Sequence, residues 1–126
     1  MTKLDKYGSQ EWENTYSLED HLGYTRAVIQ TNDGGYLYGG WGGIVKADSN
    51  GMEEWKNNSR EYGAFPYYED VIQHSNGSYY AVGGPGQGQA QFVKFDSNGN
   101  VLTRKWFGGN CEDDIFRSIV ESPDNM

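Results

Sequence analysis

Acidic residues gather at three places along the chain, Glu19-Asp20, Glu69-Asp70 and Glu112-Asp113-Asp114. A pair of carboxylates can serve as general acid and base on a glycosidic bond, and a cluster of carboxylate oxygens can hold a hard cation. The three clusters do not fall at equal positions in the sequence repeat described below, which argues against a repeated ring of metal ligands. We expect mostly solvated loop charge and no metal site, and keep Asp113 and Asp114 as candidate ligand-binding residues.

Other residue types that perform chemistry give weaker patterns. The turns Asp48–Gly51 and Asp96–Gly99 resemble the start of a calcium-binding loop, but their glycine stands at the fourth position instead of the sixth, which indicates plain hairpin turns. The two histidines, His21 and His74, hold different repeat positions. The single cysteine, Cys111, stands beside three acidic residues that disfavour its thiolate. The sequence predicts no catalytic residue and no cofactor.

Aromatic side chains in connecting segments are better candidates for binding. Trp41 lies between glycines, and an indole presented in this way offers a flat surface for a sugar or another protein. The alternative is that Trp41 lines the interior between sheets. A longer Gly-rich connection follows in the next repeat. The candidate ligand-binding residues are Trp41, Tyr67, Tyr68, Gln87, Gln89, Asp113 and Asp114.

Composition sets the class of protein that must position these residues. The chain has 126 residues, enough for one domain, and 4 Trp, 10 Tyr and 5 Phe supply its core. Its 18 Gly and 3 Pro indicate short strands joined by tight turns. A net charge of −8 argues against nucleic-acid binding. With no apolar run of membrane-spanning length and no signal peptide, we expect no membrane segment, and both an exported and a cytoplasmic location stay open.

An internal repeat organises the chain. The segment Val28-Ile29-Gln30 returns as Val71-Ile72-Gln73 and as Ile119-Val120-Glu121. A lysine precedes each segment by 25 residues, at Lys3, Lys46 and Lys94. The successive periods are 43 and 48 residues, and the five extra residues fall in the Gly-rich 83–89 connection.

Each period contains four short strands separated by turn sequences, and no stretch has the periodicity of a helix. The predicted strands are Arg26–Thr31, Tyr36–Gly40, Gly43–Ala47, Met52–Asn57, Asp70–Gln73, Tyr79–Gly83, Gln91–Phe95, Val101–Phe107 and Arg117–Glu121. A single four-stranded sheet exposes both faces to water, so each must stack on a neighbour. The sequence therefore predicts an all-β fold of propeller-type repeats, each a four-stranded antiparallel blade.

The segments VIQTNDGGYLYGG, IVKADSNGMEEW and VKFDSNGNVLTRKWFGGN resemble a bacterial propeller-type repeat whose blades read roughly IIQTSDGGYIVAG…WLVKLDSNGNIEWQKTYGG. The resemblance covers nearly the whole chain and implies a multi-bladed propeller with no particular chemistry. We expect one repeat domain: residues 1–27 as the second half of a blade, 28–70 and 71–118 as blades, and 119–126 as the first strand of a blade split between the termini.

About three blades per chain is fewer than the roughly four to eight of closed propellers. We therefore favour a homodimer that completes a ring, the alternative being that the chain is part of a longer propeller. The predicted function is a non-enzymatic binding or assembly module with a carbohydrate or protein ligand. Two alternatives stay open: a polysaccharide-active enzyme that uses loop carboxylates, and a purely structural, self-associating repeat protein.

Overall fold

The computed structural model describes residues 1–14, 25–58, 66–85, 89–108 and 116–123, and every regular element within these ranges is a β-strand. An N-terminal hairpin pairs β1 (Thr2–Leu4) with β2 (Gln10–Glu13). The first sheet contains β3 (Thr25–Gln30), β4 (Tyr36–Gly40), β5 (Gly43–Ala47) and β6 (Glu53–Asn57). The second sheet contains β7 (Pro66–Gln73), β8 (Tyr79–Pro85), β9 (Ala90–Phe95) and β10 (Val101–Phe107). Both sheets are antiparallel with strands in sequence order, which confirms the predicted all-β fold with four-stranded sheets.

The turns between the third and fourth strands of each unit follow one design. In the first sheet, the Asp48 carboxylate accepts hydrogen bonds from the backbone N–H groups of Asn50 and Met52, at 2.8 and 2.9 Å. Gly51 adopts a φ of 78°, a left-handed conformation that glycine reaches without strain. Asp96 and Gly99 repeat this arrangement in the second sheet. These aspartates support hairpin turns, as their spacing predicts.

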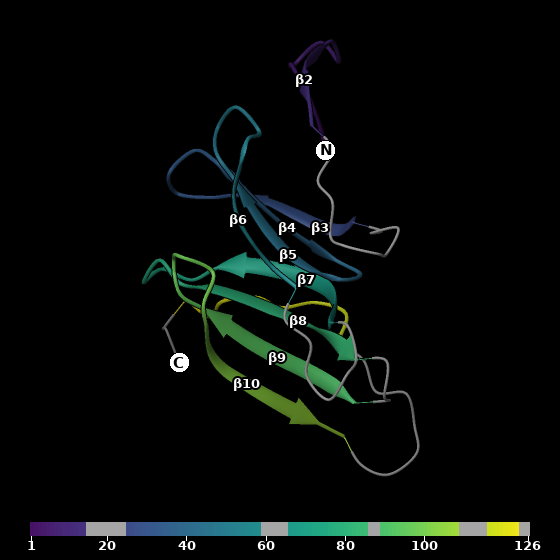
Figure 1. Cartoon of the computed structure of the whole chain (residues 1–126), viewed down its shortest axis with the longest axis vertical. Helices are drawn as coiled ribbons and strands as arrows, with labels where there is room; N and C mark the ends of the chain where they lie inside the picture. The colour runs from purple at the N-terminus through teal and green to yellow at the C-terminus, as the bar shows by residue number, and fades with distance from the viewer. Residues whose placement is uncertain (15–24, 59–65, 86–88, 109–115, 124–126) are drawn as a thin grey trace.

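The two four-stranded sheets pack face to face (Figure 1), and β7 of the second sheet contacts β3, β4 and β5 of the first. Alternate residues of the facing strands point into the space between the sheets and form the main core. Its fully buried members are Leu37, Ile44, Tyr68, Val71, Tyr79, Ala81, Val93 and Phe95. A smaller cluster, Tyr38 and Val45 with Met1 packed against them, lies between the first sheet and the N-terminal hairpin. The first sheet is thus covered on both faces, by the second sheet on one side and by the N-terminal hairpin on the other.

Equivalent residues join successive units. Between the N-terminal hairpin and the first sheet, the ring centroids of Trp12 and Tyr36 lie 5.5 Å apart, and Asn14 Nδ2 donates a hydrogen bond to the Gly51 carbonyl at 2.9 Å. Between the two sheets, the ring centroids of Trp55 and Tyr79 lie 5.8 Å apart. Here Asn57 Nδ2 donates to the Gly99 carbonyl at 2.8 Å. The hairpin therefore packs on the first sheet in the way that the first sheet packs on the second.

Two strand predictions differ from the structure by more than two residues. Strand β7 begins at Pro66 instead of Asp70, because its early residues pair with the glycine-rich end of β8. A Cβ atom on Gly83 would lie 1.9 Å from the Tyr67 carbonyl oxygen, so the strands approach this closely only at a glycine. The predicted strand Arg117–Glu121 was wrong. This part of the described C-terminal segment, residues 116–123, lies against the second sheet without strand pairing.

Candidate functional site

Trp41 lies in a two-residue turn between β4 and β5 that is fastened to the second sheet. Gly40 pairs with Gly43 across the turn, and Gly42 adopts a φ of 102°. The Gly42 N–H donates a hydrogen bond to the Pro66 carbonyl at 2.8 Å, and Trp41 forms an isolated β-bridge with Tyr67. The backbone that presents Trp41 is therefore held at the junction of the two sheets.

The indole of Trp41 is braced on one side and open on the other. Its ring meets the Tyr67 ring edge to face, with centroids 5.6 Å apart and planes at 71°. Even so, Trp41 keeps 48% of its surface exposed. The alternative prediction placed Trp41 in the interior between the sheets, and this exposure shows that much of the side chain faces solvent. An aromatic ring fixed on one side and open on the other is suited to stacking.

Charged side chains surround Tyr67. The Arg26 guanidinium lies 5.7 Å from the centroid of the Tyr67 ring, within the range of a cation–π interaction. Burial raises the pKa of Tyr67, and a hydrogen bond and the negative charge of Glu69 raise it further, against the opposing effect of Arg26. Arg117 Nη1 lies 3.4 Å from Glu69 Oε1. We call Arg26, Trp41, Tyr67, Glu69 and Arg117 the Trp41 cluster.

The three charged members of the cluster occupy one repeat position. Arg26, Glu69 and Arg117 each stand two residues before the start of a Val-Ile-Gln type segment. Stacking of the units places Arg26 and Glu69 beside the same ring, Tyr67, and pairs Glu69 with Arg117. From sequence, Glu69 was considered only as part of an acidic pair, and Arg26 and Arg117 were not predicted as site residues. The signal that could have found them was present in the same alignment that revealed the repeat.

The other candidate ligand-binding residues do not join the Trp41 cluster. Tyr68 is 1% exposed, and its ring packs edge to face on Phe95 with centroids 6.1 Å apart, so it belongs to the core. Gln89 is exposed just before β9, in the connection of the second sheet that corresponds to the Trp41 turn. Gln87, Asp113 and Asp114 lie outside the described residues. The structure thus brings Trp41 and Tyr67 together and places Tyr68 elsewhere.

The second residue of the acidic pair, Asp70, supports the C-terminal segment. Its Oδ2 accepts hydrogen bonds from the Ile119 N–H at 3.0 Å and from the Ser118 hydroxyl at 3.2 Å. Within the described ranges, no group of three or more His, Cys, Asp or Glu side chains is arranged to hold a metal ion. Across the same ranges the structure has no helix long and apolar enough to cross a membrane.

Comparison with known proteins supports the fold alone. No protein-family model matches the chain, and no curated protein matches it. Among solved structures, the chain is similar to a protein of unknown function from Bacteroides caccae, with a TM-score of 0.63 and 19% sequence identity. The similarity covers 85% of this chain and 36% of that chain, so the present chain spans little more than a third of the length of its structural neighbour.

Proposed function

We propose that the chain is a non-enzymatic binding module built from propeller-type β-repeats, and that it binds a glycan on the exposed face of Trp41. The repeated contacts between units support a stacked-blade scaffold. The observation that carries the binding role is an indole that is 48% exposed although its edge is fixed against Tyr67. Because a fixed ring loses little conformational entropy on binding, its exposed face favours stacking by the apolar face of a sugar ring.

The charges of the Trp41 cluster support a hydroxyl-rich ligand. Arg117 is 75% exposed along its side chain and holds the Glu69 carboxylate from the solvent side. A guanidinium offers several N–H donors in a fixed plane, and a carboxylate accepts hydrogen bonds from hydroxyl groups. The Glu69 side chain is only 9% exposed, so it orients Arg117, whose exposed N–H groups are the donors offered to a ring that stacks on Trp41.

Binding is tested with purified chain and a panel of soluble plant, bacterial and host polysaccharides, by affinity electrophoresis and then by calorimetry. W41A is expected to weaken binding at least tenfold, and W41F to retain part of it. Y7A is the matched control, because Tyr7 is 80% exposed on the N-terminal hairpin and lies outside the cluster. Circular dichroism checks that each variant folds.

Equal affinity of W41A and the wild-type chain would overturn the assignment of this site. If the ligand is a protein instead of a glycan, the chain is expected to bind none of the polysaccharides in the panel. The enzymatic alternative predicts new reducing ends when the bound polysaccharide is incubated with the chain. We expect none, because Glu69 is held by Arg117 and Asp70 supports the backbone of Ile119.

A further inference from the structure

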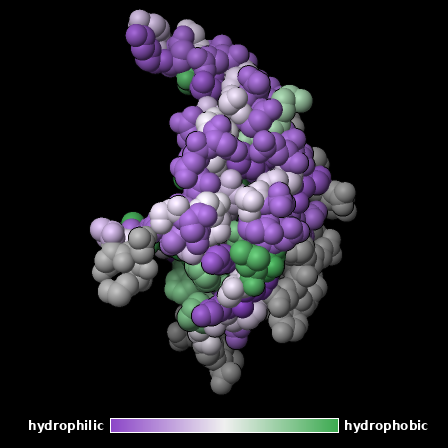
Figure 2. All heavy atoms as spheres, turned by 90° about the vertical axis from the view of Figure 1, so that its left-hand side faces the viewer, coloured by the Kyte–Doolittle hydropathy of each residue, from purple (hydrophilic) through white to green (hydrophobic). Residues whose placement is uncertain are grey.

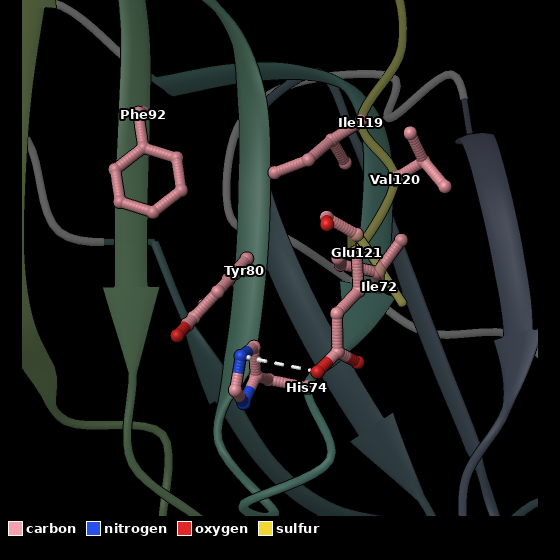
Figure 3. A pocket seen from close by; sticks show the side chains of 8 residues that line it. Ile72, His74, Tyr80, Phe92, Ile119, Val120 and Glu121 are labelled. Atoms are coloured by element: carbon pink, nitrogen blue, oxygen red, sulfur yellow. Dashed lines mark ion pairs between the residues drawn. The ribbon is translucent and has the colours of Figure 1, made fainter. Parts of the chain in front are cut away.

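The face of the second sheet that points away from the first sheet carries an open groove of about 330 Å³. Ile72, Tyr80 and Phe92 form its floor, and Ile119 and Val120 of the C-terminal segment form one side (Figure 3). Viewed from the left of Figure 1, hydrophilic residues dominate the upper part of the surface, whereas hydrophobic residues gather lower, at the level of the second sheet (Figure 2). The groove is therefore an apolar surface that nothing in this chain covers across the described residues.

The C-terminal segment is fixed beside the groove by polar contacts. The Ser75 N–H donates a hydrogen bond to Glu121 Oε2 at 3.1 Å, and the Ser75 hydroxyl donates to Glu121 Oε1 at 2.6 Å. His74 Nε2 lies 3.2 Å from the same Oε1 (Figure 3). Between the two sheets, the Asn32 N–H donates to Gln73 Oε1 at 2.7 Å in the equivalent position. The segment thus lies on the second sheet as β7 lies on the first.

The molecule itself shows what closes such a groove. By repeat position, Ile72, Tyr80 and Phe92 correspond to Ile29, Leu37 and Ile44 of the first sheet. Leu37 and Ile44 are completely buried in the core that β7, β8 and β9 form against them. Beside the open groove the C-terminal segment takes the place of β7, so β8 and β9 are the strands without an equivalent there. The buried residues that those strands supply are Tyr79, Ala81, Val93 and Phe95. The equivalent occupant of the open groove is therefore a pair of β-strands with apolar side chains on one face.

The N-terminal hairpin is a pair of strands that carries one such apolar side chain, Leu4, on its outward face. Its inward residues Met1 and Trp12 pack on the first sheet, while Thr2 and Leu4 point the other way. Leu4 is 54% exposed and holds the repeat position of Phe95, the residue that is fully buried between the two sheets. The hairpin thus carries an exposed apolar residue at the position that fills the equivalent space elsewhere in the chain.

Charge on the two surfaces is complementary. Lys94 Nζ lies 5.6 Å from the centroid of Tyr80 on the groove face, and Lys105 pairs with Phe92 in the sheet and so points to the same side. On the hairpin, Glu13 pairs with Thr2 and therefore shares its outward face. In a chain with a net charge of −8, a surface with two lysines is distinctive and favours an acidic partner surface.

We propose that the groove binds the N-terminal hairpin of a second copy of this chain, with Leu4 of that copy packed over Tyr80 and Ile119. The contact joins two different surfaces, so it is head-to-tail, and two such contacts close a two-chain ring if the rotation permits it. The proposal goes beyond the glycan-binding role. It rests on the stacked-repeat part of the proposed function and is independent of Trp41.

The test is the solution mass by light scattering across a concentration series, with a chain mass of 14.2 kDa as reference. The wild-type chain is expected at twice this mass. L4E on the hairpin and Y80E in the groove are each expected to weaken association at least tenfold. V120E is a second groove variant that leaves the core intact, because Val120 is 86% exposed. M52E is the matched control, since Met52 is 59% exposed and lies on neither surface.

Mixing separates this contact from a symmetric one. L4E keeps an intact groove and Y80E keeps an intact hairpin, so an equimolar mixture is expected to form a one-to-one dimer although neither variant associates alone. A wild-type monomer at several hundred micromolar would overturn the proposal. So would unchanged association of L4E and both groove variants, or loss of association in M52E. W41A is expected to remain dimeric, so failure of glycan binding and failure of this contact are distinguishable.

Discussion

The two faces of the second sheet differ in the surroundings that they give to the lysine of one repeat position, Lys46 on the inner side and Lys94 on the outer side. On the inner side, Lys46 of the first sheet is 1% exposed, and its Nζ lies 2.7 Å from Glu54 Oε2 and 3.0 Å from Asp33 Oδ2. Burial alone would lower the pKa of Lys46, but the two carboxylates outweigh it and raise the pKa above its ordinary value. On the outer side, the equivalent Lys94 lies against the ring of Tyr80.

Sequence explains the difference. Glu54 occupies the bulge of the β5–β6 pair, and Glu11 occupies the same bulge in the N-terminal hairpin, where it pairs with Lys3. Leu102 stands at that position in the second sheet, and Asn76 stands where Asp33 stands in the first. The backbone of the repeat is thus independent of the ion pair, whereas compensation of the lysine charge depends on acids that only some units carry. Lys3 has such an acid and still keeps 39% of its side chain exposed, so burial of the lysine also requires a sheet that covers it.

The largest expected effect comes from the two phenylalanines of β9, which point to opposite faces. Phe95 is fully buried between the sheets, so F95A is expected to lower the free energy of unfolding by about 3–5 kcal/mol. Phe92 lines the open groove, so F92A is expected to cost about 1–2 kcal/mol in the monomer. Urea unfolding in the L4E background, where association is weakened, measures both. Equal losses of unfolding free energy in F95A and F92A would contradict the distinction between a filled inner face and an open outer face.

Removing both acids around Lys46 is expected to have the next largest effect. The double variant D33N/E54Q leaves a buried ammonium without a compensating charge, at a cost of about 3 kcal/mol in the free energy of unfolding. K46M in the wild-type background is the control. The side chains of Asp33 and Glu54 keep 56% and 42% exposure, so water solvates them after the lysine is gone and the loss is smaller. A larger loss in K46M than in the double variant would contradict this account of the buried charge.

The repeat made the fold predictable, and it did so locally. Turn sequences such as Asp48–Gly51 determine their own conformation through hydrogen bonds between residues close in sequence. Along a strand, successive side chains point to opposite faces of the sheet, so a two-residue period of apolar residues predicts the buried face. The predicted bounds of Tyr36–Gly40, Gly43–Ala47 and Val101–Phe107 agree with β4, β5 and β10. These features depend on interactions between residues close in sequence, so they can be predicted from a single sequence.

The site depended on contacts between units, which are harder to predict from one sequence. Tyr67 and Tyr68 were both predicted as candidate ligand-binding residues, yet successive residues of a strand point to opposite faces. The predicted strands began at Asp70 and ended at Gly83, whereas in the structure Tyr67 and Tyr68 already pair with Gly84 and Gly83 and so alternate within β7. From its glycine neighbours Trp41 was a candidate for binding, with burial between the sheets as the alternative. Its contact with Tyr67 arises only when the two sheets pack together, and so does the contact of Arg26 with Tyr67.

The pH dependence of stability tests the inner side further. A hydrogen bond from the Thr31 hydroxyl, with contributions from the Gly35 N–H and Lys46, lowers the pKa of Asp33 from 3.8 to about 2. A carboxyl group with a lowered pKa in the folded state stabilises the fold above its unfolded pKa and loses this contribution as the pH falls from about 4 through about 2. Because the side chain of Asp33 is 56% exposed, solvent screening reduces the contribution to about 1 kcal/mol.

Urea unfolding of the wild-type chain and of D33N between pH 6 and pH 2.5 measures this contribution as a difference. The wild-type chain is expected to be the more stable at pH 6, and the gap is expected to narrow below pH 4. A gap that stays constant with pH would show that the charge of Asp33 contributes nothing to the folded state.

The smallest expected effect comes from a substitution that gives the outer side an acid which the inner side already has. L102E places a carboxylate in the bulge where Glu11 and Glu54 pair with lysines, and in the L4E background we expect a gain of about 0.5 kcal/mol from the exposed pair with Lys94. A double-mutant cycle with K94M isolates that coupling. In the associating chain, the docked hairpin would cover Lys94 as the second sheet covers Lys46, so the same cycle is expected to give a larger coupling. Equal coupling in both backgrounds would mean that no second copy reaches Lys94, and that the outer face resembles the inner one in sequence position only.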